Sequence, residues 1–308
     1  MEFQGVAESE AMQSLLTECR KYASINRPIL IRGERGTGKE LLAKFIQANS
    51  ERSDQPFVSI NCAAVSEELL TAEIYGHEKG AFTGADQTKI GKLEQADNGT
   101  LFLDEIGNMS TAFQQKLLRV MEYQEFERIR GTEKIKVDVR IISATNANLE
   151  ELMAEDLFRK DLYDRLTFAE LRIPALRRRK KDIPLLIVHF VRLLHEEIPN
   201  LQQKTFDRET VRMMMDYYWP GNIRELKNIV ERLYLGPTED EITPSDLPPE
   251  VSGLEITGDS FHEKVEEYKK KLITEALGDA GGNQKKAAEK LQMSYDQFRH
   301  YYKKFLSS

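Results

Sequence analysis

Short apolar runs alternate with amphipathic stretches along the first part of the chain. Runs at 29–31, 57–60, 101–103 and 139–142 predict buried strands, and a fifth strand is predicted at 167–171. Two intervening stretches carry apolar residues at helical spacing, namely Leu41, Leu42, Phe45 and Ile46, then Phe113, Leu117, Val120 and Met121 behind a Ser110 N-cap. Strands that alternate with helices require crossover connections, so the pattern predicts an α/β fold with a mostly parallel sheet covered by helices.

The pattern changes after about residue 173. No further strand is predicted, and residues 182–235 have helical spacing that is interrupted at 219–222, where Pro220 suits the start of a new helix and Asn222 its cap. Residues 236–259 contain four prolines among acids and glycines, which is the composition of a linker. We therefore expect an α/β core at 1–172, a helical subdomain at 173–235, a linker at 236–259 and a separate helical domain at 260–308.

Charge is unevenly distributed along this 308-residue chain. The net charge is −7, yet residues 283–308 hold six Lys and Arg against two acids, a net charge of +4, which leaves −11 for the remainder. A basic tail on an acidic body is expected of a protein that joins a catalytic body to a polyanion-binding module. No apolar run reaches the ~20 residues of a membrane span, no secretory signal is present, and two distant cysteines suit a reducing compartment. We expect a cytoplasmic protein without membrane insertion.

A glycine-rich loop follows the first predicted strand and opens the first amphipathic helix. Its residues are Gly33, Glu34, Arg35, Gly36, Thr37, Gly38, Lys39 and Glu40. Glycines let such a backbone curl so that its N–H groups point at phosphate oxygens, and the lysine reaches the β- and γ-phosphates. The strict pattern ends in Ser or Thr, whose hydroxyl holds Mg²⁺, whereas this loop ends in Glu40. Alone, the loop fits either a phosphate site or an ordinary glycine turn.

An apolar strand that ends in two carboxylates favours the phosphate site. Asp104 can hold Mg²⁺ through water, and Glu105 can orient and deprotonate the attacking water. The alternative is that both residues cap the next helix. Polar residues end two other strands: Thr145 or Asn146 is placed to sense the γ-phosphate, and Asn61 to hydrogen-bond Glu105, although each is also common in turns.

A loop of small residues with one aromatic lies between these two elements. It reads Gly80, Ala81, Phe82, Thr83, Gly84 and Ala85. The glycines allow a tight or left-handed backbone, so that Phe82 at the tip would expose a large apolar surface of the kind used in binding. Burial of Phe82 in the core is the alternative, and the commoner fate of an aromatic residue.

The basic tail has the pattern of a helix-turn-helix. A short helix at 284–291 with Ala287, Ala288 and Leu291 inward is followed by a turn and a second helix at 295–305 that Ser294 can cap. The candidate DNA contacts, which include Tyr295 at the start of the second helix, are Lys285, Lys286, Tyr295, Gln297, Arg299, His300 and Lys303. We expect Gln297, Arg299 and His300 to face bases and the lysines to meet phosphates. A solvated basic helical hairpin is the alternative.

Taken together, the motifs at 33–40, 80–85, 100–105, 158–165 and 219–226 resemble those of the bacterial enhancer-binding activators of sigma-54 RNA polymerase. These activators are AAA+ ATPases, and the resemblance covers essentially the whole chain. It implies an AAA+ fold with a parallel sheet sandwiched by helices, a helical lid and a small all-α Fis-type helix-turn-helix domain. It also implies ATP and Mg²⁺ as ligands, and it accounts for Glu40, which the family commonly has at that position.

The resemblance also implies roles for individual residues. Asn61 would restrain Glu105 until the loop engages its target, Arg224 in the lid would contact the nucleotide, and Arg159 and Arg165 match the arginine-finger region. One or both fingers would reach the γ-phosphate of a neighbouring subunit, which requires a ring, usually a hexamer. Without the family pattern, Arg165 would be expected to form a surface salt bridge with Asp161 or Asp164. The loop at 80–85 would grip the sigma factor when ATP is bound.

The leading hypothesis is an ATP-driven activator that binds double-stranded enhancer DNA and remodels the closed complex of sigma-54 polymerase. An AAA+ unfoldase or helicase-type motor is one alternative, and a DNA-binding repressor that uses ATP only to assemble is another, although Glu105 argues against the latter. The ATPase pattern begins almost at Met1. We therefore expect no sensor domain ahead of it, although a shortened form of a relative that bears a receiver domain would look alike. We also expect regulation by a separate protein that binds the body.

Overall fold

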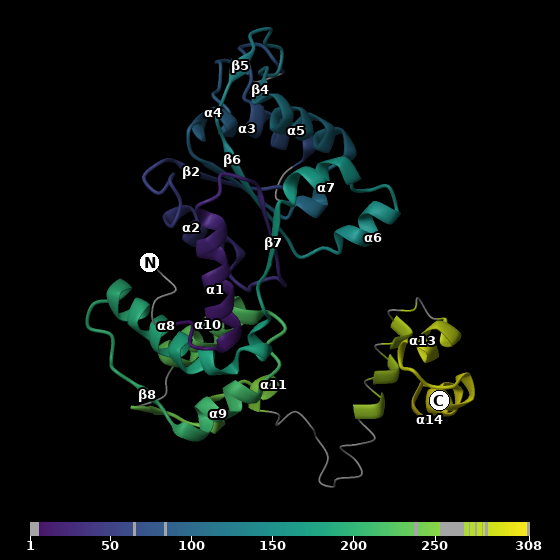
Figure 1. Cartoon of the computed structure of the whole chain (residues 1–308). Helices are drawn as coiled ribbons and strands as arrows, with labels where there is room; N and C mark the ends of the chain where they lie inside the picture. The colour runs from purple at the N-terminus through teal and green to yellow at the C-terminus, as the bar shows by residue number, and fades with distance from the viewer. Residues whose placement is uncertain are drawn as a thin grey trace. The chain divides into compact units, whose positions relative to one another are not determined.

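The computed structural model describes residues 6–63, 66–82, 85–236, 240–252 and 283–306, together with 268–270, 272–274, 276–278 and 280. The chain divides into two compact units, residues 1–243 and residues 244–308 (Figure 1). The first unit contains the sheet and the lid helices, and the second contains the C-terminal helices. In the described residues, no helix has the length and apolar character needed to cross a membrane.

The core of the first unit alternates strands and helices as the sequence predicts. Its strands are β1 (Ile29–Arg32), β2 (Phe57–Asn61), β3 (Thr100–Asp104), β6 (Arg140–Thr145) and β7 (Ala169–Arg172). Its helices are α1 (Glu10–Ala23), α2 (Lys39–Ala48), α3 (Glu67–Tyr75), α4 (Lys92–Gln95), α5 (Thr111–Tyr123), α6 (Leu149–Ala154) and α7 (Lys160–Leu166). Ser110 caps α5, since its hydroxyl accepts the Phe113 N–H at 3.2 Å, as predicted.

The five strands form one parallel sheet in the order β2-β3-β6-β1-β7. Because all five run the same way, their carboxyl ends meet at one edge, where ligands of such sheets bind. That edge brings the ends of β1, β2, β3 and β6 together, so the phosphate loop, Asn61, Asp104 and Thr145 become neighbours. Two strands of two residues each, β4 (Glu125–Phe126) and β5 (Ile135–Lys136), form an antiparallel hairpin between α5 and β6. This hairpin was not predicted.

Helices cover both faces of the sheet (Figure 1). One face packs residues of α1 and α2, such as Leu16, Leu42 and Ile46, against Ile29 and Ile31. The other packs residues of α3, α5, α6 and α7, including Phe113 and Leu162, against the opposite side of the strands. The alternation of Ile29, Leu30 and Ile31 between the two clusters is the period-2 geometry of a strand buried on both faces.

The remainder of the first unit is mainly helical. It contains α8 (Ile183–Glu197), α9 (Arg208–Asp216) and α10 (Asn222–Leu235), which confirms the predicted helices. The prediction that strands stop after the core is wrong in one detail, since β8 (Thr205–Phe206) and β9 (Glu241–Ile242) form a short parallel pair. Trp219 is fully buried and donates its Nε1–H to Met214 O at 2.7 Å, which anchors the segment before α10.

The second unit is all-helical in its described residues. Two short elements, η4 (Pro244–Asp246) and α11 (Pro249–Ser252), lie at its start, and α13 (Gln284–Lys290) and α14 (Tyr295–Leu306) lie at its end. Ala287 and Ala288 are buried with Phe298, as the inward face of the predicted first helix requires. A small core of this kind suits an independently folded module of two helices around a tight turn.

Candidate nucleotide site and binding surfaces

Residues 33–40 form a curled loop between β1 and α2. Gly36 and Gly38 have φ values of 74° and 98°, in the left-handed region that glycine adopts without strain. An added Cβ at Gly36 would collide with the carbonyl oxygen of Gly221, so the close approach of the lid also requires glycine. No side chain caps the first turn of α2, which leaves its N–H groups directed at the loop as donors for an anion.

Lys39 extends from this loop toward the end of β3. The residue is buried, and its Nζ donates to Gly33 O at 3.2 Å and lies 3.8 Å from Glu105 Oε1. A buried ammonium held between a loop carbonyl and a carboxylate is fixed in place as a cation for phosphate oxygens. The structure thus brings together the lysine and the acidic pair that the sequence identified.

Asp104 ends β3, and the backbone turns sharply at Glu105. Glu105 has a φ of 56° and donates its N–H to Asp104 Oδ1 at 2.9 Å, while its side chain makes no capping bond to the short helix that follows. Glu105 therefore stands at the N-cap position of that helix, as the alternative interpretation has it, but its carboxylate does not act as the cap. Burial raises the pKa of the Asp104 carboxyl; the nearby Lys39 charge opposes this shift and Glu105 adds to it.

Asn146, which follows β6, is the amide nearest the Glu105 carboxylate. With its side-chain nitrogen turned toward Glu105, it donates to both oxygens, at 3.2 Å for Oε1. Asn61 lines the pocket that Asp104 and Glu105 also line, whereas Asn146 does not, but Asn61 Oδ1 accepts the Ala63 N–H at 2.8 Å. The predicted hydrogen bond from Asn61 to Glu105 is thus not among those that the described residues make, and Asn146 faces Glu105 instead.

Thr145 is fully buried, and its hydroxyl accepts the Ala147 N–H at 3.0 Å. Its carbonyl accepts the Gly33 N–H at 3.3 Å, which ties the end of β6 to the first residue of the phosphate loop. Of the two residues predicted to sense the γ-phosphate, Asn146 is therefore the one beside the carboxylate, and Thr145 shapes the turn that presents it.

The start of α10 attaches the lid to the phosphate loop. Asn222 is fully buried; its Nδ2 donates to Arg35 O at 3.0 Å and to Glu34 Oε2 at 3.1 Å, and its Oδ1 accepts the Leu176 N–H at 2.8 Å. The Ile223 N–H donates to the Gly36 carbonyl at 2.9 Å. The prediction that Asn222 caps the helix is wrong, since Gly221 is the N-cap and the Asn222 amide binds across to the loop.

Two arginines that the sequence analysis did not identify reinforce this attachment. Arg177 makes a bidentate ion pair with Glu34, whose pKa is lowered to about 2 by the hydrogen bonds from Arg177 and Asn222. Arg179 is almost fully buried and donates to Thr37 O at 2.9 Å. Both belong to an arginine-rich run at 177–179, but nothing in the sequence distinguishes these contacts from solvated surface charge.

A pocket of about 610 Å³ opens between the loop, the sheet edge and α10. Its lining, which includes most of the predicted nucleotide-binding residues, comprises Arg35, Gly36, Thr37, Gly38, Lys39, Glu40, Leu41, Asn61, Ala63, Asp104, Glu105, Ile223, Arg224, Lys227 and Asn228. Lys227 and Asn228 were not predicted, although they follow Arg224 at the i+3 and i+4 spacing that places side chains on one face of a helix. The volume suits a small-molecule ligand.

The two candidate finger arginines lie outside this pocket. Arg159 is the N-cap residue of α7 and pairs with Asp161 at 2.7 Å. Arg165, in the last turn, pairs with Glu122 at 3.2 Å rather than with Asp161 or Asp164. Both ion pairs are exposed, so neither arginine is committed to the core and each is accessible to a neighbouring molecule.

The loop at 80–85 lies between two segments that an isolated β-bridge joins, from His77 to Lys89. A second bridge joins His77 to Ile129, in the connection between β4 and β5. Phe82 is 46% exposed, with its ring centroid 4.8 Å from that of His77, whereas Ala81 and Ala85 are buried. The Gly80 carbonyl accepts from Arg130 at 2.9 Å. Phe82 is therefore not in the core; Thr83 and Gly84 lie outside the described residues.

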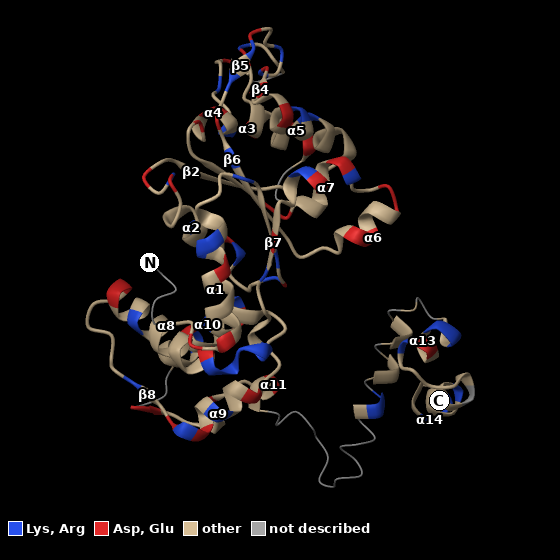
Figure 2. Cartoon of the chain, viewed as in Figure 1, with Lys and Arg blue, Asp and Glu red and all other residues tan. Residues whose placement is uncertain are grey.

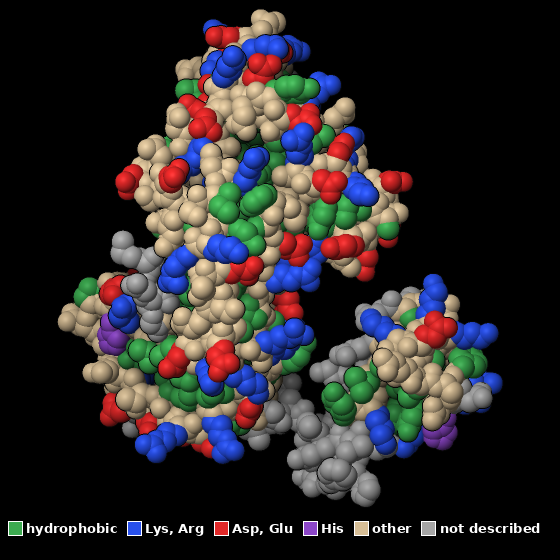
Figure 3. Space-filling view, in the orientation of Figure 1, with side chains coloured by type: hydrophobic (Ala, Val, Ile, Leu, Met, Phe, Trp, Pro, Cys, Tyr) green, Lys and Arg blue, Asp and Glu red, His purple; other side chains and the backbone are tan. Residues whose placement is uncertain are grey.

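The candidate DNA contacts are all exposed on α13 and α14, with Lys and Arg positions visible along α13 in Figure 2. Ser294 caps α14, since its hydroxyl accepts the Gln297 N–H at 3.3 Å, and the Gln297 side-chain carbonyl oxygen accepts the Ser294 N–H at 3.1 Å. This reciprocal pair is a capping box, so Gln297 uses its carbonyl oxygen locally. On the visible face of the first unit, by contrast, acids and bases are interspersed (Figure 3).

Three family models match consecutive parts of the chain. The sigma-54 interaction domain matches residues 6–172, the AAA+ ATPase lid domain matches 177–263, and the Fis family of bacterial regulatory proteins matches 264–303. The first alone covers more than half of the chain. These matches confirm the predicted family and the fold class of an AAA+ domain with a helical lid and a C-terminal helix-turn-helix.

The chain is also similar to whole proteins. It is 43% identical over 292 residues to the transcriptional regulatory protein ZraR of Escherichia coli, covering 94% of this chain and 66% of that one. It is 41% identical over 314 residues to the Psp operon transcriptional activator of Escherichia coli, covering 97% of both. The segments at 283–289 and 295–299 indicate the same likeness to that phage shock activator. The chain thus spans about two thirds of the length of ZraR.

Among solved structures, the chain resembles NtrX from Brucella abortus in complex with ATP. The TM-score is 0.73 at 35% identity, and the likeness covers 98% of this chain and 69% of that one. The resemblance extends through the nucleotide pocket and the C-terminal helices, because almost the whole chain is included.

Proposed function

The chain belongs to the family of sigma-54-dependent transcription regulators with an AAA+ ATPase domain and a Fis-type DNA-binding domain, and from this premise we propose that it is an ATP-driven activator. It binds enhancer DNA through α13 and α14, assembles as a ring, and uses ATP hydrolysis to convert the closed complex of sigma-54 polymerase to the open complex. The observation that carries this proposal is the pocket in which the phosphate loop, Asp104, Glu105 and Arg224 meet.

The donors in this pocket fit a nucleoside triphosphate. The uncapped first turn of α2 and the buried Lys39 supply N–H groups and a cation for the phosphates, and Arg224 and Lys227 add positive charge from the lid. The left-handed backbone at Gly36 and Gly38 curls the loop around the proposed phosphate position. A side chain at Gly36 would collide with the Gly221 carbonyl oxygen and disturb this curl. ATP bound by NtrX supports the same ligand here.

Asp104 is the residue suited to a magnesium ion, directly or through water, since carboxylate oxygen is the ligand that Mg²⁺ prefers. When bound, the metal supplies positive charge that neutralises the phosphates. Glu105 orients the attacking water and accepts its proton. Asn146 holds the Glu105 carboxylate through its amide, and Asn61, in the same pocket, is the candidate to exchange with it when the nucleotide state changes.

Arg159 and Arg165 serve the neighbouring protomer. Both lie outside the pocket of their own chain and hold only exposed ion pairs, which cost little to exchange for a phosphate. A finger supplied in trans makes hydrolysis depend on assembly, so a ring, with a hexamer as the expected size, is the active form. Hydrolysis then proceeds only where two protomers meet.

The loop at 80–85 is the contact for the sigma factor. Its exposed Phe82 provides an apolar anchor, and its flanking residue His77 bridges Ile129 in the β4–β5 connection of the same domain. In the chain, this segment is followed by α4 and then by β3, which ends in Asp104, and we propose this connection as the route from the γ-phosphate to the loop. The nucleotide bound in the pocket, ATP or ADP, thereby determines the position of the loop at 80–85.

Phe82→Ala tests this function. We expect it to retain ATP hydrolysis in the ring and to lose open-complex formation on a sigma-54 promoter, as should Thr83→Ala. Val188→Ala is the matched control, because it also removes an exposed apolar side chain, from the lid. Normal open-complex formation by Phe82→Ala and Thr83→Ala would sink the role of the loop, and a wild-type chain that opens no promoter would sink the function.

A further inference from the structure

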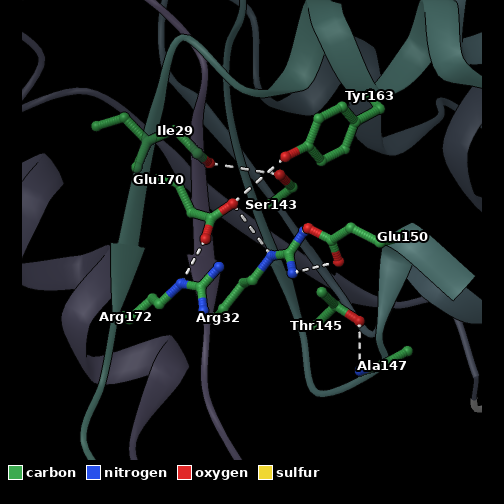
Figure 4. Close-up of polar contacts among 9 residues, drawn as sticks. All are labelled: Ile29, Arg32, Ser143, Thr145, Ala147, Glu150, Tyr163, Glu170 and Arg172. Atoms are coloured by element: carbon green, nitrogen blue, oxygen red, sulfur yellow. Dashed lines mark hydrogen bonds and ion pairs between the residues drawn. The ribbon is translucent and has the colours of Figure 1, made fainter.

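Arg32, the last residue of β1, lies at the centre of a charged cluster at the carboxyl edge of the sheet (Figure 4). Its side chain is only 13% exposed. Nη1 and Nη2 donate to the two carboxylate oxygens of Glu150 on α6, at 2.7 and 2.8 Å. Nε lies 3.2 Å from Glu170 Oε2 on β7, and the guanidinium lies 6.0 Å from the centre of the Tyr163 ring on α7.

Strand register explains why the cluster needs both acids. Arg32 is directly opposite Arg172 on β7, and Leu30 is opposite Glu170, so that two arginines face each other across neighbouring strands. Glu170 lies between them, with Oε1 2.6 Å from Arg172 Nε. Like charges in such a pair are destabilising unless an acid intervenes. Arg172 is largely exposed and pairs with Glu170, whereas Arg32 also reaches α6 and α7.

A cluster of this kind does little for stability. The Glu150 side chain is 52% exposed, so water screens its ion pair with Arg32 and the pair contributes little. The cost of burying the Arg32 guanidinium offsets much of its attraction to Glu170. What the guanidinium provides is direction, because its planar fork fixes the angle at which Glu150 approaches. We therefore expect the main contribution of the cluster to be the orientation of the elements that it joins, and not the stability of the fold.

The element that needs orienting is α7. It has only seven residues, which is too short to hold itself in place. Leu162 and Leu166 bury one side in the core. Tyr163 has its ring centre 6.0 Å from the Arg32 guanidinium, and its hydroxyl donates to Glu170 Oε2 at 3.5 Å, so both members of the cluster adjoin α7. Arg159 precedes this helix and Arg165 lies in its last turn, so the position of α7 sets the direction of both candidate fingers.

We propose that Arg32 is a positioning residue for trans hydrolysis, which fixes the arginine-finger helix α7 relative to the strand that carries the phosphate loop. Arg32 directly precedes Gly33, the first residue of that loop. Its side chain therefore connects the proposed nucleotide pocket of one protomer to the helix proposed to complete the pocket of the neighbouring protomer. The inference rests on the proposed function, in which Arg159 or Arg165 acts on the adjacent protomer. Arg32 itself does not line the pocket proposed for the nucleotide.

Mixed rings separate this role from an effect on the protomer's own site. Donor chains carry Lys39→Ala, which disables their own pocket, and are mixed in excess with wild-type acceptors, so that turnover reports on the fingers that the donors supply. Adding Arg32→Met to the donors should lower turnover per acceptor by about 10-fold or more, since misplacement by about 1 Å can cost 100-fold. The KM of the acceptors for ATP should not change.

Conservative and matched variants sharpen the result. Arg32→Lys keeps one charge without the fork and should give an intermediate loss; Glu150→Gln in the donors should resemble it. Arg172→Met, from the same cluster but on the exposed side of Glu170, should leave turnover unchanged. Full turnover with Arg32→Met donors would overturn the inference, as would donors that no longer enter rings in sedimentation, because the proposal requires a misdirected finger in an intact ring.

Donors with Arg159→Ala or Arg165→Ala test the proposed function separately. If both leave acceptor turnover unchanged, the trans finger is wrong and the inference about Arg32 falls with it. If either lowers turnover while Arg32→Met does not, only the inference about Arg32 is wrong.

Discussion

Lys39 and Glu105 face each other across the phosphate pocket, with the ammonium nitrogen 3.8 Å from the nearer carboxylate oxygen. One residue begins α2 and the other follows β3, so their approach depends on the order of strands in the sheet. The pair joins the cation proposed to bind phosphate to the base proposed for hydrolysis. Any negative group that enters between them is attracted by one and repelled by the other.

Glu105→Gln should therefore separate binding from chemistry. The amide keeps the size of the side chain but cannot accept the proton from water, and we expect hydrolysis to fall by about 100-fold or more. ATP affinity should be unchanged or higher, because a negative charge beside the phosphates has been removed. Fluorescent nucleotide binding and phosphate release measure the two quantities. Glu51→Gln, at an exposed site away from the pocket, is the control, and equal turnover in both variants would exclude Glu105 as the base.

Asp104 predicts a pH dependence for magnesium binding. Burial, the largest cause, raises the pKa of its carboxyl, so the neutral form persists to a higher pH than in an ordinary aspartate. Since only the carboxylate binds a cation, Mg²⁺ affinity should fall as pH drops through this raised value. Magnesium titrations of nucleotide binding at several pH values measure the effect, and Asp104→Asn should remove the pH dependence along with most of the affinity.

The same shift has a consequence for stability without ligands. Because the pKa of the Asp104 carboxyl is raised in the folded state, the folded protein binds this proton more tightly than the unfolded chain does. The carboxyl therefore favours folding at pH values below its ordinary pKa. That contribution is lost as the pH rises through the raised pKa. Thermal unfolding of wild type and Asp104→Asn in EDTA, compared across that interval, gives the sign. A wild-type Tm that gains on the variant with rising pH there would contradict the assignment.

Asn222→Gly should weaken the attachment of the lid. Glycine keeps the left-handed backbone, for which Asn222 has a φ of 53°, and removes only the amide that binds Leu176, Arg35 and Glu34. Leaving the buried Leu176 N–H without its acceptor costs about 1–3 kcal/mol. We expect a lower free energy of unfolding and weaker ATP binding in denaturation and binding titrations. Arg232→Gly, at an exposed position of the same helix outside the pocket lining, should cost only its helix propensity, and an equal effect on ATP affinity in both variants would refute the attachment.

The sheet is well predicted from the sequence because its strands are apolar runs buried on both faces, and short runs bounded by turn residues are typical of such strands. Leu30 and Phe102 lie where these runs place them, and the alternation with helices dictates parallel strands. The two-residue strands at Glu125–Phe126 and Thr205–Phe206 were missed, because two residues carry no periodicity and their pairing depends on distant partners. The interruption at 219–222 was predicted from the sequence, but the contacts of Asn222 with the phosphate loop were not.

Residues of the candidate site that lie in a motif were predicted from the sequence, and those that reach the phosphate loop by tertiary contact were not. Lys39, Asp104 and Glu105 follow from strand ends and a glycine loop. Arg177 and Arg179 contact the same loop from the lid, but a run of basic residues resembles solvated surface. The choice between Asn61 and Asn146 depends on side-chain direction at two strand ends, which spacing does not determine.

We predict that the C-terminal helices make two kinds of DNA contact, to phosphates and to bases. Changes in salt concentration and in DNA sequence can distinguish them. Lys303 is exposed near the end of α14, and Lys303→Gln should weaken binding to all sequences and reduce the slope of log affinity against log salt by about 1. Arg299 lies one turn earlier and is proposed to face bases, so Arg299→Ala should cost about 1–3 kcal/mol on enhancer DNA and much less on unrelated DNA. Fluorescence anisotropy of the full chain across a salt series measures both. Glu289→Gln, on the exposed face of α13, is the charge control and should not reduce the slope. Equal losses on both DNAs for Arg299→Ala would assign that arginine to the phosphates and leave sequence reading to other residues of α14.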